Sequence, residues 1–208
     1  MTSRLEQGSV VTVFGGSGFL GRHAVRALAR DGWRILRPSL VFGPEDELFN
    51  RFAAMAGFSP FLPLIGGGGT KLQPLYAGDV GAAIAAVCAG QGKPGTIYEL
   101  GGPEVVTFRQ LLDHTQEWSG RKRRYLRIPF WAAKLGALLT LPLPNGLRPL
   151  TVDQIRMLQS DNIVSKTAQA EGRVLAGLGI EHPHTMEAVV PGYLERFQPH
   201  GQFAHYRG

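Results

Sequence analysis

A glycine-rich turn near the amino terminus, between an apolar run and an amphipathic segment, most constrains what this chain can fold into. Residues 10–14 form a β-branched apolar run, and the segment after the glycines repeats apolar residues at helical spacing, with Leu20, Ala24 and Leu28 on one face. This order predicts a strand, a tight turn and a helix. It favours an α/β fold.

The glycines of this turn match a phosphate-binding pattern in two registers, G-x-x-G-x-x-G from Gly15 and G-x-G-x-x-G from Gly16. A small residue permits the turn, a missing Cβ lets a pyrophosphate reach the backbone, and the last glycine brings the helix against the strand. The phosphate then lies at the positive end of the helix. The candidate cofactor-binding residues are Gly15, Gly16, Ser17, Gly18, Phe19, Leu20 and Gly21. The alternative is a turn that serves only close helix packing.

Composition excludes several other classes of protein. Of 208 residues 44% are apolar and 18% charged, which suits a compact globular chain. The single cysteine, Cys88, excludes a disulfide framework, and its apolar neighbours predict a buried position on a helix. The GGGGTK run at residues 66–71 is not a phosphate-binding P-loop, because Thr70 precedes Lys71, and we expect a flexible loop there. No secretory or transit signal is visible, so we expect a cytoplasmic protein.

The net charge of +6 is concentrated in one segment. RKRRYLR, residues 121–127, contributes five positive charges, and the rest of the chain is close to neutral. This distribution excludes a broad nucleic-acid-binding face.

The pattern changes after Ile35. A dinucleotide-binding domain normally carries an acidic residue about 20 residues past the glycines, but no acid lies between Asp31 and Glu45. Arg34 and Arg37 stand there instead and favour a 2′-phosphate, hence NADP over NAD, although either cofactor stays open.

The segment LRPSLVFGPED, from Leu36 onward, resembles the sixth strand and following loop of the extended short-chain dehydrogenase/reductase superfamily, the NAD-dependent epimerase/dehydratase-like proteins. The head of the chain resembles that superfamily's first strand, glycine loop and first helix. The resemblance implies that Arg37 and Pro38 lie on the nicotinamide side. It also implies that about a hundred residues are absent after Ile35, because each strand–helix unit takes about 30 residues.

Motifs in the carboxyl-terminal half narrow the resemblance. YAGDVGAAIAAV, TIYELGGPEVVTFRQLL and TVDQIRMLQSDNIVSKTAQAEGRVLAGLGI are similar to the branch of the NAD(P)H-binding accessory subunit of respiratory complex I. In that branch the nucleotide is mainly a structural or regulatory ligand. The resemblance therefore implies an NAD(P)H-binding, largely non-catalytic protein linked to NADH:ubiquinone oxidoreductase or to ubiquinone metabolism.

Catalysis by this chain is not expected. Enzymes of the superfamily use a Tyr-x-x-x-Lys pair, in which the lysine lowers the tyrosine pKa, and no tyrosine here has that spacing. We therefore predict no catalytic residue. His182 and His184 flank a proline and lack a second ligand cluster, so we expect a solvated turn and no metal site. Two alternatives stay open: an NAD(P)-dependent reductase or epimerase whose catalytic segment is missing, and a truncated product without function.

The expected architecture is a shortened Rossmann-like α/β fold with a small, mostly helical carboxyl-terminal domain. Residues 1–43 are the remnant of the dinucleotide-binding domain, residues 44–198 hold the remaining sheet elements and a substrate-type domain, and residues 199–208 are a tail. Asp79 and Thr107 are the expected N-caps of two helices. Helices are expected near residues 47–56, 79–89, 107–119, 130–140, 151–159, 166–178 and 186–197, and strands near 37–42, 96–100 and 125–128.

The segment from Arg121 to Leu143 joins the basic cluster to a short apolar helix that carries Phe130 and Trp131. It is the candidate contact with a respiratory complex or with an anionic membrane surface, which would make the protein peripheral at the inner membrane. The alternative is that the helix packs inside the protein, because Leu135, Leu138, Leu139 and Leu141 wrap around much of it.

Overall fold

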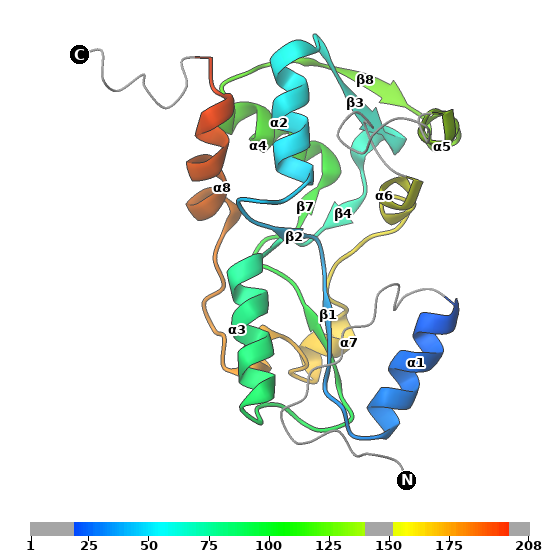
Figure 1. Cartoon of the computed structure of the whole chain (residues 1–208), viewed down its shortest axis with the longest axis vertical. Coiled ribbons are helices and arrows are strands. Elements are labelled where there is room, and N and C mark those ends of the chain that lie inside the picture. The colour runs from blue at the N-terminus through cyan, green and yellow to red at the C-terminus, as the bar shows by residue number, and fades with distance from the viewer. Residues whose placement is uncertain (1–18, 140–151, 200–208) are drawn as a thin grey trace, which may run out of the picture.

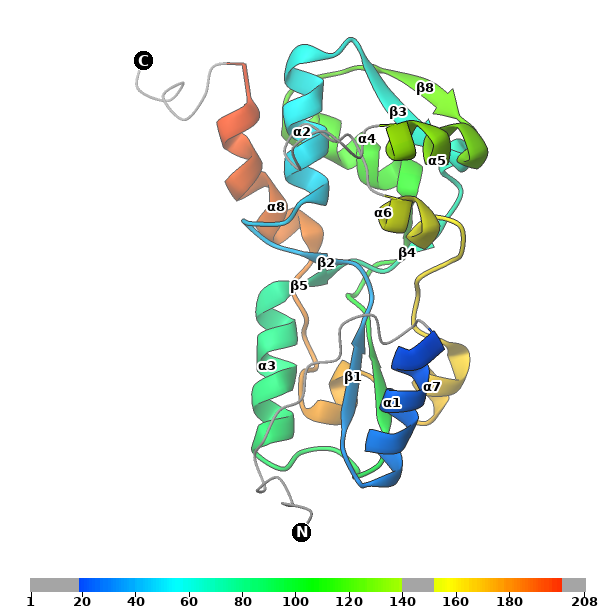
Figure 2. The ribbon, with the colours of Figure 1, turned by 45° about the vertical axis from the view of Figure 1, so that its right-hand side comes forward.

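The computed structural model describes residues 19–139 and 152–199, which form two lobes joined by short strands (Figures 1 and 2). The lower lobe contains α1 (Phe19–Arg30), β1 (Ile35–Pro38), α3 (Ala77–Cys88), β6 (Ile97–Leu100), α7 (Lys166–Ala170) and the 3₁₀ helix η3 (Leu175–Leu178). The upper lobe contains α2 (Leu48–Phe58), β3 (Phe61–Ile65), the 3₁₀ helix η1 (Gly66–Gly68), β4 (Lys71–Leu72), β7 (Val106–Thr107), α4 (Phe108–Trp118), β8 (Arg124–Ile128), α5 (Phe130–Leu139), α6 (Val152–Met157), α8 (Met186–Leu194) and the 3₁₀ helix η4 (Glu195–Phe197). The linking strands are β2 (Val41–Phe42) and β5 (Leu75–Tyr76).

Parallel strand pairs join segments that are distant in the sequence. β1 pairs with β6, with Ile35 opposite Ile97, and β3 pairs with β8, with Phe61 opposite Arg124. β2 and β5 form a short parallel pair between the lobes, whereas β4 and β7 are antiparallel. Parallel pairing requires a crossover connection, so this topology confirms the α/β class.

The end of α1 explains how the chain passes directly from the first helix to β1. Gly32, at φ 88°, follows the helix, its N–H donates to the carbonyl of Ala29, and the N–H of Trp33 donates to the carbonyl of Leu28. These two bonds form a Schellman motif, in which glycine supplies the left-handed conformation. The resemblance places the missing segment between Ile35 and Leu36. In the structure these two residues are consecutive members of β1.

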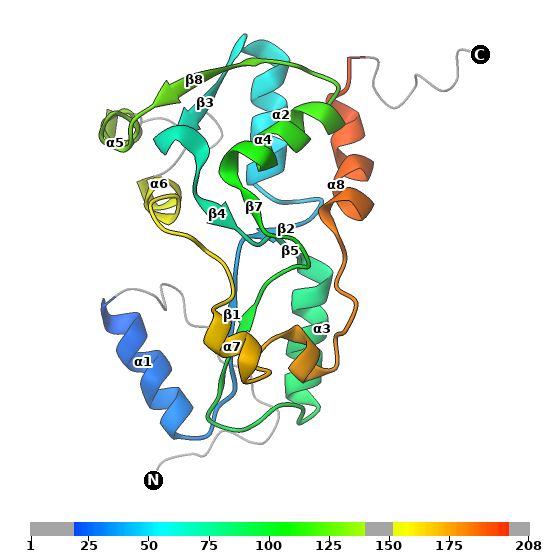
Figure 3. The same ribbon diagram turned by 180° about the vertical axis from the view of Figure 1, so that it is seen from behind.

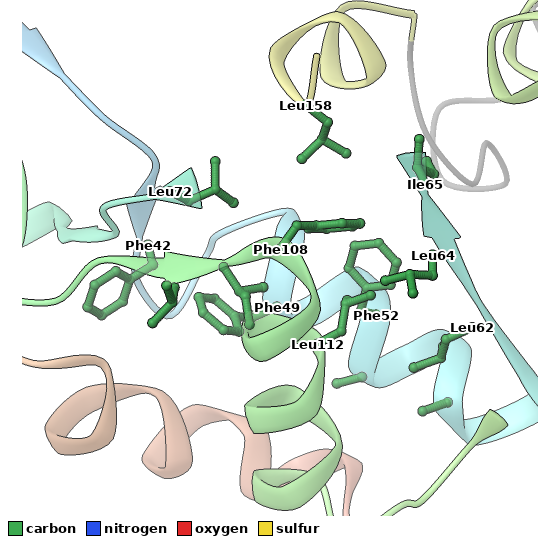
Figure 4. Close-up of a cluster of buried hydrophobic side chains, with 14 of the residues drawn as sticks. Phe42, Phe49, Phe52, Leu62, Leu64, Ile65, Leu72, Phe108, Leu112 and Leu158 are labelled. Carbon is green, nitrogen blue, oxygen red and sulfur yellow. The ribbon is translucent and has the colours of Figure 1, made fainter. Parts of the chain in front are cut away.

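Two apolar clusters hold the lobes. In the upper cluster, Phe42, Phe49, Phe52 and Phe108 are almost completely buried, and the rings of Phe52 and Phe108 meet edge to face (Figure 4). The lower cluster is smaller and consists of Leu75, Ala83, Tyr98, Leu100, Leu175 and Leu178. The linking strands serve both lobes, because Phe42 packs into the upper cluster while Leu75 packs into the lower one.

The glycine run after β3 is a shaped turn and not the flexible loop that the sequence predicts. Gly66, Gly67 and Gly68 have φ values of 59°, 77° and 75° and form η1. A Cβ on Gly66 would lie 2.1 Å from the ring of Phe130, and one on Gly68 would lie 2.5 Å from Leu64. The glycines therefore allow α5 to pack against the end of β3.

Most of the expected helices and strands are confirmed, with several corrections. The expected helix at 166–178 is broken into α7 and η3, because Gly172 adopts a φ of 66° between them. The expected strand at 37–42 is two short strands, and β3, β4, β5 and β7 were not predicted because they are short or contain proline.

The side-chain environment predicted from the sequence is confirmed for Thr107 and is wrong for Asp79 and Cys88. Thr107 is confirmed as the N-cap of α4, in a capping box with Gln110. Asp79 is not a cap: Tyr76 precedes α3, and the buried Asp79 carboxylate accepts hydrogen bonds from the His184 backbone N–H instead. Cys88 is exposed at the end of α3, so its predicted burial is wrong.

Two arginines of the basic cluster, Arg121 and Arg123, bind backbone carbonyl groups of the upper lobe. The Nε atoms of Arg121 and Arg123 donate to the carbonyls of Phe197 and Ala56, near the carboxyl ends of η4 and α2. Cations are favourable at helix carboxyl termini, so these two arginines have structural partners. No helix in residues 19–139 or 152–199 combines the length and apolar character that crossing a membrane requires.

Asp46 connects α2 to α8. Its Oδ1 accepts from the N–H of Phe49 at 2.6 Å, and its Oδ2 accepts from the hydroxyl of Tyr193 at 2.5 Å. Burial raises the pKa of Asp46, although these hydrogen bonds partly oppose the shift. One carboxyl group therefore caps a helix and orients a tyrosine 147 positions away.

We predict that Asp46→Ala lowers the free energy of unfolding by about 2 kcal/mol, because it removes a cap and orphans the Tyr193 hydroxyl. Asp46→Asn should retain both contacts. A raised carboxyl pKa contributes stability that is fully present below the unfolded pKa and is lost as pH rises through the folded pKa. Urea unfolding should therefore show Asp46→Asn gaining on the wild type as pH rises from about 4 to 7. Equal loss in both variants would contradict this account.

Candidate functional site

The predicted phosphate-binding turn lies partly outside the described residues. Gly15, Gly16, Ser17 and Gly18 precede the first described residue, and Phe19, Leu20 and Gly21 form the first turn of α1. The helix predicted after the glycines is confirmed as α1, which is described from Phe19 to Arg30. The assignment of these residues to a pyrophosphate stays a prediction.

The carboxyl ends of β1 and β6 form the second part of the candidate site. In open parallel sheets, ligands bind beyond these ends. Arg37 lies opposite Glu99, and Pro38 opposite Leu100. The chain then turns at Ser39, whose N–H donates to the Leu100 carbonyl at 2.8 Å and whose hydroxyl donates to the Asn162 carbonyl at 2.6 Å. Arg37 and Pro38 therefore lie at the carboxyl end of the strand pair, and their assignment to the nicotinamide side stays a prediction.

Glu99 is the most strongly held charge at this end. Its Oε2 accepts from the N–H of Ser165 at 2.7 Å, and its Oε1 lies 3.5 Å from Nη2 of Arg37. Partial burial acts to raise the pKa of Glu99, but the Ser165 hydrogen bond and the charges of Arg37 and Arg173 outweigh it and hold this pKa below its ordinary value. Glu99 is thus ionised and anchors Ser165, the N-cap of α7.

The two arginines proposed to read a 2′-phosphate have different environments. Arg34 donates from Nε to the carbonyl of Gly92 and from Nη2 to that of Gly90, so it holds the turn before β6. The Arg37 side chain is 68% exposed despite its ion pair with Glu99. Of the two, Arg37 is therefore the more exposed, and its assignment to a 2′-phosphate stays a prediction.

Tight packing limits the space beside these strand ends. A Cβ on Gly102 would lie 1.8 Å from the carbonyl oxygen of Pro74, and one on Gly101 would lie 2.5 Å from Cδ of Gln73. The Gln73 amide donates to the Gly102 carbonyl and accepts from the Val164 N–H. The adjoining cavity, lined in part by Gln73 and Val164, has a volume of about 230 Å³. That volume is below the usual range of small-molecule pockets.

Tyr125 and Tyr193 are not activated for proton transfer. Burial raises the pKa of Tyr125 and Tyr193 well above the ordinary value, and their hydrogen bonds to the carboxylates of Asp113 and Asp46 raise it further. A catalytic tyrosine of this superfamily needs the opposite shift, from a nearby lysine. The chemistry of these side chains is that of structural tyrosines.

His184 lies on an exposed turn, as expected, but its side chain also binds α3. Its Nδ1 lies 2.8 Å from Oδ1 of Asp79, and its ring meets the edge of Tyr76 with centroids 5.1 Å apart. Within the described ranges, no group of three or more histidine, cysteine or acidic side chains could hold a metal ion. Sequence reasoning missed this pair because Asp79 and His184 are 105 positions apart.

Comparison with known proteins defines the class to which this fold corresponds. No family model matches the chain. In structure it is similar to the UDP-glucose 4-epimerase of Thermotoga maritima, with a TM-score of 0.56 and 16% identity over 86% of this chain and 50% of that one. It is equally similar to the NADPH-dependent quinone oxidoreductase of Escherichia coli, with a TM-score of 0.56 and 21% identity over 78% and 53%. The fold is therefore the shortened Rossmann-like fold of NAD(P)-binding proteins.

Sequence similarity is more specific. Over 147 residues the chain is 40% identical to the mitochondrial subunit 9 of the NADH dehydrogenase (ubiquinone) 1 alpha subcomplex from Arabidopsis thaliana. The match covers 64% of this chain and 35% of that protein, so the chain spans about a third of the relative's length. This finding confirms the resemblance to the accessory subunit of respiratory complex I.

We predict that Glu99→Gln lowers the free energy of unfolding at pH 7 by about 1–2 kcal/mol, because a charge-assisted hydrogen bond and its ion pairs are weakened. A lowered carboxyl pKa contributes stability above the unfolded pKa that is lost as pH falls through the folded pKa. The difference from the wild type should therefore shrink toward pH 3 in denaturant titrations. The exposed Glu104→Gln is the matched control. A pH-independent difference would show that the charge of Glu99 is not the cause.

Proposed function

We propose that this protein is a non-catalytic NAD(P)H-binding accessory protein of an NADH:ubiquinone oxidoreductase. The observation that carries the proposal is the 147-residue similarity to a named subunit of that enzyme, on a chain with an NAD(P)-binding fold. Because the chain spans about a third of that relative, partner and ligand are proposals for this chain.

In this proposal the pyrophosphate lies on the turn from Gly15 to Gly21, at the amino end of α1. The nicotinamide side lies near Arg37 and Pro38. The exposed guanidinium of Arg37 supports a preference for NADPH over NADH, because it can pair with a 2′-phosphate. Binding is weak, since the hollow lined by Arg37, Ser39 and Glu99 has a volume of only about 10 Å³, far smaller than a dinucleotide requires.

The nucleotide has a structural or regulatory role. No tyrosine of the chain has a lysine four positions later, and Tyr125 and Tyr193 have raised pKa values. Both observations oppose the rival proposal, a reductase or epimerase acting through this chain alone. We place the protein peripherally at the membrane that carries the respiratory complex.

A fluorescence titration with NADH and NADPH tests nucleotide binding. We predict a dissociation constant above about 10 μM, or binding weaker than roughly −7 kcal/mol. Gly18→Val should abolish the remaining binding, because its side chain occupies the space of the phosphate. Gly81→Val in α3, where a Cβ meets no atom within 4 Å, is the matched control and should bind as the wild type does.

Three outcomes would contradict the proposal. Unchanged affinity in Gly18→Val would show that the glycine turn is only structural. A dissociation constant below about 10 μM would show that the absent strands are not needed for the pocket. No detectable binding by the wild type would leave the truncated, non-functional alternative.

A further inference from the structure

α5 has one buried face and one exposed apolar face. Phe130, Ala133 and Ala137 point toward the upper cluster. Trp131, Leu135 and Leu138 recur at positions i, i+4 and i+7, which lie on one side of a helix, and their exposed fractions are 71%, 51% and 56%. We name these three side chains the α5 stripe. The expectation that Leu135 and Leu138 favour burial is therefore wrong.

The strands next to α5 are also unusual on their outer face. Leu62, Leu64 and Ile65 of β3 are buried, whereas Phe61 and Pro63 alternate with them and lie opposite Arg124 and Leu126. Among these are Phe61, which is 47% exposed, and Leu126, which is 55% exposed. Figures 1 and 3 show β3, β8 and α5 together at one end of the upper lobe. The α5 stripe thus belongs to a broader apolar end of the molecule.

The charges carried by β8, α5 and the paired segment are of one sign, and the neighbouring acid is Asp113 of α4, which accepts a hydrogen bond from Tyr125. Residues 119–139 contain six basic residues and no acidic residue, and residues 57–66 of the paired strand carry no charge. Arg121 and Arg123 hold helix ends, as described above. Lys122, Arg124 and Arg127 are exposed, and Lys134 is half-buried beside the α5 stripe. The surface therefore combines apolar side chains with four outlying cations.

This combination fits an anionic lipid surface better than a second copy of the chain. The apolar end offers five exposed side chains, whereas a stable protein interface takes about 800 Å² and about 20–30 residues from each partner. Two copies would also bring like charges together, which is unfavourable. A bilayer with anionic headgroups satisfies both components, because basic residues are attracted to it and tryptophan is suited to its interface.

We propose that the α5 stripe inserts into the interface of an anionic membrane, with Arg124, Arg127 and Lys134 on the headgroups. The inference deepens the proposed function and rests on it for the identity of the membrane. The contact is peripheral and reversible. It places the upper lobe on the lipid, whereas the candidate nucleotide site lies on the lower lobe.

The test is co-sedimentation of the full chain with phosphatidylcholine vesicles containing about 30% phosphatidylglycerol, and with phosphatidylcholine alone. We expect binding to the anionic vesicles that weakens at least tenfold between about 50 and about 300 mM salt. The neutral vesicles should bind the protein at least tenfold more weakly. Absence of binding to the anionic vesicles overturns the inference, as does binding that salt does not weaken.

Two sets of variants assign the contact. Trp131→Ser with Leu135→Ser and Leu138→Ser should reduce binding at least tenfold, while the control Ile84→Ser with Val105→Ser, two other exposed apolar residues, should not. Arg124→Gln with Arg127→Gln and Lys134→Gln should reduce it roughly a hundredfold, at about fivefold for each charge. The charge-matched control is Arg26→Gln with Lys93→Gln and Lys166→Gln, on the lower lobe. Circular dichroism and urea midpoints establish that each variant is folded.

Two further readouts separate the possible causes of failure. NADH titration of the same preparations measures nucleotide binding independently. Intact nucleotide binding without vesicle binding overturns this inference and leaves the proposed function standing. Sedimentation velocity reports self-association: a dimer that the stripe variant abolishes would make the surface a contact between copies and would also overturn the lipid proposal.

Discussion

Parallel pairing between strands about sixty residues apart holds both lobes of this protein. β1 meets β6 in the lower lobe and β3 meets β8 in the upper lobe, and the two crossover connections overlap in the sequence. Neither lobe is therefore a continuous piece of chain. The short pair of β2 and β5 carries the chain between them, with Phe42 in one cluster and Leu75 in the other. Disruption of the β1–β6 pair or of the β3–β8 pair should therefore destabilise both lobes.

The candidate site depends on this arrangement. Because β1 and β6 are parallel, Arg37 and Glu99 reach the same end of the strand pair, where Ser39 and Ser165 add hydrogen bonds. The Schellman motif after α1 returns the chain directly into β1. The upper lobe supplies none of these groups. It carries the basic and apolar end formed by β3, β8 and α5, so two surfaces with different chemistry lie on different lobes.

The sequence was informative where the signal is local. Helical spacing and capping residues such as Thr107 located most helices, and the helix predicted after the glycine turn is present as α1. Contacts between distant residues could not be predicted from the sequence. No local pattern indicates that Asp79 contacts His184, or that the ring of Phe130 packs where a side chain on Gly66 would lie. The prediction that Leu135 and Leu138 are buried was wrong for the same reason. The sequence of an apolar helix does not show which of its faces has a packing partner.

The central claim is that a nicotinamide nucleotide binds at the amino end of α1 and the carboxyl end of β1. Amide chemical-shift mapping with NADPH tests it most directly, because each backbone N–H reports separately. The account predicts saturable shifts at Phe19, Leu20 and Gly21, together with Arg37 and Ser39. Shifts confined to the cavity beside Gln169 and Val174, or scattered without saturation, would contradict it.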